Sequence, residues 1–199
     1  GYLEKSISAP AGDLYTWGDL VVGVHDGTHV AWEVVDGLPE GEVVDPTVHD
    51  PEGFRRGLVG AGDDVGLWTS NAVDDLSNPA VAYHDRTHKA LKLARRVGSD
   101  WNVQTVQKPK APALGEVGRY AKLLFVNGVF QIAYLFVEPG ENGALRSGVR
   151  VATSASAEPA EGEWSFEEVV SNPDTPLPEK GATTYANVTG AYVAIAATK

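Results

Sequence analysis

The strand pattern of this chain is clearest in Val81-Ala82-Tyr83-His84-Asp85-Arg86-Thr87-His88, which is followed by Ala90-Leu91-Lys92-Leu93-Ala94-Arg95 and then by Trp101-Asn102-Val103-Gln104-Thr105-Val106. Apolar and polar side chains alternate in these runs, and Gly, Pro, Asn or Asp residues separate them. Alternation with a period of two over about 5–8 residues is typical of β-strands. The stretch therefore predicts successive antiparallel strands joined by short turns.

The same plan recurs along the chain. Residues 22–29 align with residues 81–88, and residues 132–137 and 193–197 follow as more diverged copies. The segment ahead of a copy also recurs, at residues 65–70, 117–122 and 181–185. Units of about 50–60 residues with up to four short strands each predict an all-β chain, a β-propeller-type array of about four small antiparallel blades.

The repeat predicts a single β-propeller-like domain over residues 1–199. Its units are expected at roughly 11–46, 65–109, 117–173 and 181–199, with residues 1–10 forming the closing strand of the last unit. The last unit offers fewer strand candidates than the others. The ring is therefore expected to be closed by the N-terminal strand or by another chain.

The order of the characteristic residues within one unit resembles that of a known class of repeat proteins. Ala82-Tyr83-His84-Asp85, the strand Leu91-Lys92-Leu93-Ala94 and the late Trp101 resemble the repeats of bacterial β-propeller proteins with loosely sialidase-like (BNR-type) blades. The resemblance extends over nearly the whole chain. Its signature residues serve packing and turns, so the resemblance implies a fold and no reaction.

The composition of the chain excludes several classes of function. The chain has 27 acidic and 16 basic residues and a net charge of −11, which argues against nucleic acid as a partner. No apolar run approaches the ~18 residues of a membrane span, so no membrane insertion is expected. The absence of Cys excludes disulfides, thiolate metal sites and cysteine nucleophiles. The absence of both Cys and Met gives resistance to oxidation, which favours an extracellular or cell-surface location.

Four of the five histidines lie in a repeated His-Asp-x-Thr-His pattern, as His25 and His29 in one copy and His84 and His88 in the other. If the two imidazoles of a pair face each other across a hairpin, each pair can bind a divalent metal such as zinc, copper or nickel. The alternative is that the pattern is ordinary turn chemistry. No other cofactor is expected.

The leading functional hypothesis is a non-enzymatic surface module that binds a protein or glycan partner. Its candidate ligand-binding residues are aromatic residues at equivalent positions of the units, together with one arginine: Trp17, Trp68, Tyr120 and Arg119. A first alternative is a glycosidase- or lyase-type enzyme with its site at the propeller axis, which requires converging carboxylates. A second is a structural subunit that self-associates or completes its blade with a second chain through an open edge.

Overall fold

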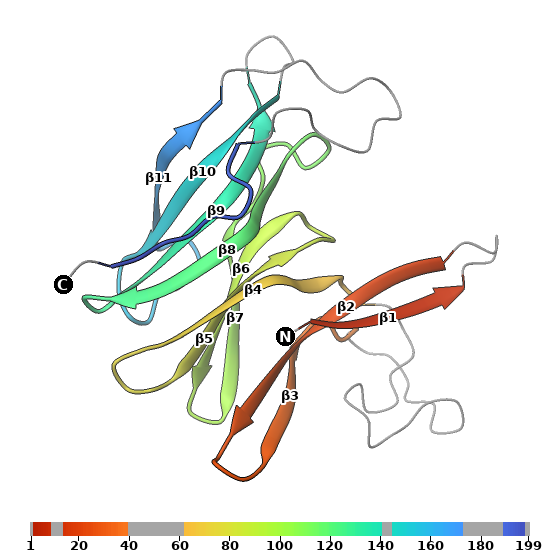
Figure 1. Ribbon diagram of the computed structural model, residues 1–199, viewed down its shortest axis with the longest axis vertical. Coiled ribbons are helices and arrows are strands. Elements are labelled where there is room, and N and C mark those ends of the chain that lie inside the picture. The colour runs from red at the N-terminus through yellow and green to blue at the C-terminus, as the bar shows by residue number, and fades with distance from the viewer. Residues whose placement is uncertain (1, 9–13, 40–61, 141–144, 173–188, 198–199) are drawn as a thin grey trace. The chain divides into compact units, whose positions relative to one another are not determined.

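The computed structural model (Figure 1) describes residues 2–8, 14–39, 62–140, 145–172 and 189–197, and the side chains of residues 2–8 and 14–17 lie outside this description. The regular structure in these ranges is β-strand throughout, and the strands pair antiparallel. The predicted all-β class is therefore confirmed. Within the same ranges there is no helix of the length and apolar character that a membrane crossing requires.

Three open sheets follow the order of the chain, as consecutive hairpins do. The first has three strands in the order β1 (Tyr2–Ser8), β2 (Leu14–His25) and β3 (Val30–Asp36). The second contains β4 (Val65–Val73), β5 (Pro79–Asp85), β6 (Ala90–Val97) and β7 (Asp100–Gln107). The third contains β8 (Glu116–Val126), β9 (Val129–Pro139), β10 (Leu145–Ser154) and β11 (Trp164–Ser171).

The chain forms two compact units, one of residues 1–67 with 85–87 and one of residues 68–84 with 88–199. In the first unit β1 pairs with β2, from Tyr2 opposite Leu20 to Ser8 opposite Leu14. The repeat predicts that residues 1–10 form the closing strand of the last unit. The structure differs, because β1 belongs to the same sheet as β2 and β3.

The core of the second unit lies between its two four-stranded sheets. It is built from apolar side chains of both sheets, which removes them from water and drives the packing: Ala80, Ala82, Leu91, Leu93, Val106, Val117, Ala121, Leu123, Phe130, Ile132, Tyr134, Phe136, Ala152 and Trp164. The central strand β9 is buried over nearly its whole length, whereas the edge strand β11 is mostly exposed. This difference explains why β9 is almost continuously apolar and β11 carries charges.

Three segments share an uncommon backbone pattern that positions aromatic side chains. In each, a glycine with positive φ is followed two residues later by an aromatic residue that also has positive φ: Gly66 (87°) and Trp68 (51°), Gly118 (95°) and Tyr120 (56°), and Gly190 (100°) and Tyr192 (59°). Bulky residues rarely adopt this region of φ, so the surrounding packing must hold them there. At Gly118 a side chain is also excluded sterically, because a Cβ atom would stand 2.8 Å from the Cα atom of Leu91.

A β-bulge recurs between the last two strands of each sheet, and the third sheet has two further register shifts between β8 and β9. The register shifts between Leu20 and Val21 of β2, between Leu91 and Lys92 of β6, and between Val149 and Arg150 of β10, each time in the pairing with the following strand. Because the shift occurs in the same pairing each time, the β2–β3 hairpin corresponds in the repeat to the β6–β7 and β10–β11 hairpins. The turn at residues 84–88 instead joins β5 to β6, so the register does not support the alignment of residues 25–29 with residues 84–88.

Candidate functional site

Three aromatic rings lie in a row on the second unit. The ring centroids of Trp68 on β4 and Tyr120 on β8 are 5.2 Å apart, and those of Tyr120 and Tyr192 are 4.8 Å apart. The ring planes are tilted by 54° and 42°, which is the offset geometry that aromatic pairs prefer over a face-to-face sandwich. The positive φ values described above therefore bring together three residues that are distant in the sequence.

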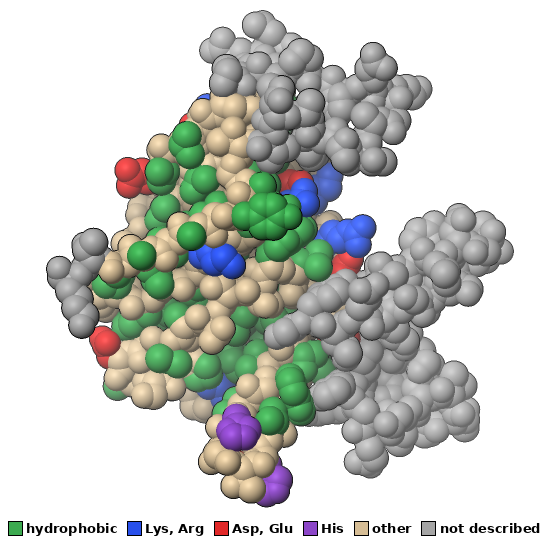
Figure 2. All heavy atoms as spheres, viewed as in Figure 1, with side chains coloured by type: hydrophobic (Ala, Val, Ile, Leu, Met, Phe, Trp, Pro, Cys, Tyr) green, Lys and Arg blue, Asp and Glu red, His purple; other side chains and the backbone are tan. Residues whose placement is uncertain are grey.

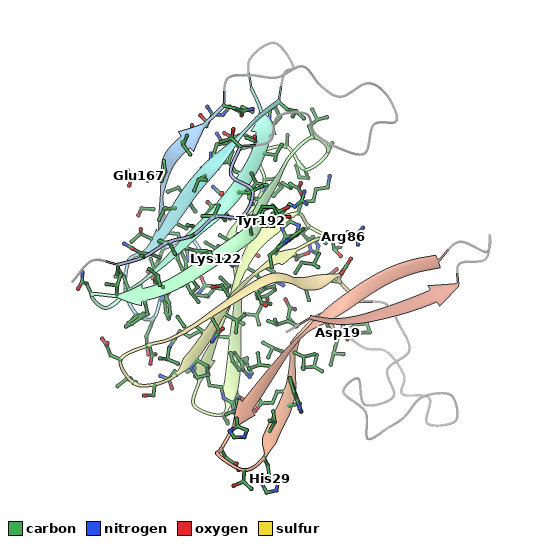
Figure 3. The ribbon with its side chains drawn as sticks, in the orientation of Figure 1. Asp19, His29, Arg86, Lys122, Glu167 and Tyr192 are labelled. Atoms are coloured by element: carbon green, nitrogen blue, oxygen red, sulfur yellow. The ribbon has the colours of Figure 1, made fainter. Side chains whose placement is uncertain are left out.

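These rings form the wall of a shallow pocket of about 230 Å³, to which Lys122 and Val193 also contribute. Tyr192 is 84% exposed, and Lys122 is exposed as well. Both lie over β8 in Figure 3, on a face where Figure 2 shows hydrophobic and basic side chains next to one another. Pockets for drug-sized ligands measure about 300–1,000 Å³, so this one suits a single small ring.

Arg119 packs against two of these aromatic residues. Its guanidinium carbon is 4.6 Å from the ring centroid of Trp68 and 5.5 Å from that of Tyr120. Its Nη1 atom donates a hydrogen bond to Oε1 of Glu116 at 2.9 Å. Its Nε atom is buried and has no hydrogen-bond partner among the described residues. The cation is thus held by one carboxylate and by two π faces.

His84 supports this arrangement from inside. It is 1% exposed, and its Nδ1–H donates to the carbonyl oxygen of Val117 at 2.9 Å, because a carbonyl can only accept. Its Nε2 atom lies 3.8 Å from Oε2 of Glu116, and its ring packs edge-on against Trp68 at 5.4 Å. Both ring nitrogens therefore face protein groups, which leaves neither directed to a metal.

The other predicted metal ligands are exposed. His25 ends β2, and His29 lies in the turn that follows, at the tip of the β2–β3 hairpin (Figure 3). The Asp26 carboxylate between them accepts hydrogen bonds from the backbone N–H groups of His29 and Thr28, both at 2.8 Å. These bonds lower the pKa of Asp26 and are typical of an Asx turn. A metal at this hairpin stays a prediction. His88 is also exposed, whereas its partner His84 is buried.

The structure brings three of the four predicted ligand-binding residues together, namely Trp68, Tyr120 and Arg119. The fourth, Trp17, is on β2, and its side chain lies outside the described residues. Sequence reasoning missed Tyr192, although Gly190-Ala191-Tyr192 repeats the glycine-to-aromatic spacing of the other two segments. The segment at 181–185, which was expected to hold the corresponding copy, lies outside the described residues.

Lys122, Glu116 and His84 were also missed as parts of this site. Lys122 follows Tyr120 by two residues on β8, but the register of β8 shifts between Arg119 and Lys122, so strand alternation does not predict that they share a pocket. Nothing in the sequence indicates that Glu116 and His84 support Arg119.

No protein-family model, curated protein or solved structure matches the chain.

Proposed function

We propose that the chain is a non-enzymatic binding module of the β-propeller type that binds a glycan at the aromatic pocket. Two features support the propeller architecture. The two four-stranded sheets follow the chain order and share the bulge position and the glycine-to-aromatic pattern. The three-stranded sheet has its bulge at the corresponding place. Radial repetition of small four-stranded sheets is the architecture that produces such regularity.

The observation that carries the proposed function is the row of rings formed by Trp68, Tyr120 and Tyr192, of which Tyr192 is almost fully exposed. Tyrosine and tryptophan are enriched at binding surfaces, and a cluster of exposed rings leaves apolar surface in water that a ligand can cover. A pyranose ring offers one flat apolar face, which stacks on an aromatic ring, and hydroxyl groups around its edge. The phenol groups and the Lys122 ammonium can hydrogen-bond to such hydroxyls.

The enzyme alternative receives less support from this pocket. A glycosidase requires two carboxyl groups flanking the scissile bond. Glu116 is nearby but already accepts a hydrogen bond from Arg119, and no carboxylate lines the pocket within the described part of the chain. The residues present offer stacking and hydrogen bonding, which is binding chemistry. An extracellular or cell-surface location, as the composition favours, would expose the module to glycans.

The test is a glycan array followed by calorimetric titration of the best glycan against Trp68→Ala. We expect the affinity to fall about 30-fold or more, because truncating a central aromatic contact costs about 2 kcal/mol or more. Trp101→Ala is the matched control. Trp101 is half-buried like Trp68 and also has a guanidinium above its ring, that of Arg96 at 5.5 Å, but it does not line the pocket.

Tyr192→Ala is the second variant, since removing a side chain that is 84% exposed should change the free energy of unfolding by less than about 0.5 kcal/mol. It should also weaken glycan binding. The proposal is contradicted if Trp101→Ala weakens binding as much as Trp68→Ala does. It is also contradicted if the chain binds no glycan and instead captures a protein partner in a way that Tyr192→Ala does not affect.

A further inference from the structure

We infer that the ligand of the aromatic pocket carries an anionic group on its ring and that Lys122 recognises this group. The inference rests on the proposed function, which it makes more specific. Lys122 is exposed at the pocket wall and forms no ion pair with any residue in the described ranges. It is therefore a positive charge that the pocket itself leaves without a counter-charge.

The local balance of charge is opposite in sign to that of the chain. Arg119 and Glu116 neutralise each other through their contact at 2.9 Å. Lys122 remains, so the site is positive on a chain whose net charge is −11. Because a chain this acidic repels anions at long range, a local cation is the feature that allows an anion to bind here. Charge complementarity thus favours an acidic ligand over a neutral one.

The arrangement of the rings excludes the opposite class of ligand. A pocket with three aromatic side chains resembles the cages that bind quaternary ammonium groups. Here the guanidinium of Arg119 already lies over Trp68 and Tyr120, at 4.6 and 5.5 Å from their ring centroids. A cationic ligand would therefore compete with this guanidinium for the ring faces and would also meet the Lys122 ammonium. An anionic ring can stack on the same aromatic side chains while its acid group reaches the ammonium.

The ammonium of lysine is a compact charge with three hydrogen-bond donors, and it can bind a carboxylate or a sulfate. Both groups occur on pyranose rings, so the shared chemistry is an anionic sugar. An exposed ion pair contributes at most about 1 kcal/mol, which corresponds to about a fivefold preference. This preference should shrink as salt is added, because exposed charges are screened.

The experiment titrates the whole chain with three oligosaccharides of equal length, built from galactose, galacturonate and sulfated galactose. At low salt we expect the two acidic ligands to bind about fivefold more tightly than the neutral one. Lys122→Gln should abolish this preference, because it weakens the two acidic ligands more than the neutral one, and Lys122→Arg should keep it. Lys108→Gln is the control, because Lys108 is also exposed and does not line the pocket.

The outcomes separate this inference from the proposed function. If all three ligands bind equally, or if Lys122→Gln and Lys108→Gln reduce the preference alike, the recognition of an anion by Lys122 is wrong while glycan binding stands. If only the galacturonate ligand or only the sulfated ligand binds more tightly than the neutral one, the anionic group that the pocket recognises is identified. If no sugar binds, both the inference and the proposed function fail.

Discussion

The guanidinium of Arg119 lies 4.6 Å from the ring centroid of Trp68, although the two residues come from different sheets. Glu116 fixes the guanidinium from one side, and the buried imidazole of His84 faces both Glu116 and the indole. The Arg119 guanidinium and the Trp68 indole are already ordered by these contacts, so they lose little conformational entropy when a ligand binds. Preorganisation of this kind raises affinity because less entropy is lost on binding.

Gly118, the one glycine of β8, should be sensitive to substitution. Alanine there must adopt a φ of about +95° and bring its Cβ to 2.8 Å from the Leu91 Cα. We expect Gly118→Ala to lower the free energy of unfolding by at least about 1 kcal/mol more than Gly98→Ala. Gly98 is the matched control, since its φ is also positive at +62° but nothing lies within 4 Å of the added atom. Equal losses in chemical denaturation would contradict the close approach.

A buried ion network lies on the third sheet. Glu138 is 3% exposed, and its Oε1 atom accepts hydrogen bonds at 3.2 Å from Nη2 of Arg150 and from Nε of Arg146. Arg146 in turn pairs with Glu168. Arg150 is itself only 7% exposed, so loss of the Glu138 charge would leave a buried cation with less compensation.

Glu138→Gln should therefore destabilise the fold by about 2–4 kcal/mol, because breaking a buried charge pair costs far more than breaking an exposed one. Glu167→Gln, on the exposed strand β11 (Figure 3), is the control and should change stability by less than about 0.5 kcal/mol. Thermal or urea denaturation of the two variants provides the measurement. A Glu138→Gln variant as stable as Glu167→Gln would show that the network contributes nothing.

Asp74 predicts a pH dependence of stability. Burial acts to raise the pKa of Asp74, but hydrogen bonds from the Asn78 side chain and from the backbone N–H groups of Asn78 and Leu76 outweigh it and lower the pKa. A lowered folded-state pKa stabilises the fold fully above the unfolded value of about 3.9, and this stabilisation is lost as the pH falls through the folded value.

We therefore expect Asp74→Ala to cost about 2 kcal/mol at pH 7 and less at pH values well below 3.9. The variant Asp75→Ala removes an exposed neighbour and serves as the control. Urea denaturation across this pH range measures both. A loss for Asp74→Ala that stays constant down to the lowest pH would show that the ionised form has no special role.

The strands could be predicted from the sequence because alternation is a local signal. Trp68 and Tyr120 could be predicted as a pair because the same residue types precede both. His84 could not be distinguished from His25, since both stand in the same local pattern, and only the packing of β5 against β8 buries one of them. Tyr192 was missed because the residues around Gly190-Ala191-Tyr192 have diverged from the other two segments.

The most direct test of the central claim, that the aromatic pocket binds a glycan, is a two-dimensional NMR titration of the indole N–H signals. The chain has five tryptophans, and Trp68→Phe identifies the Trp68 signal while keeping an aromatic ring. We predict that a binding glycan shifts the Trp68 signal strongly and leaves unchanged the signal of Trp164, whose indole N–H donates to Gln104 inside the core. A glycan that binds while the Trp68 signal stays in place would show that it binds outside the aromatic pocket.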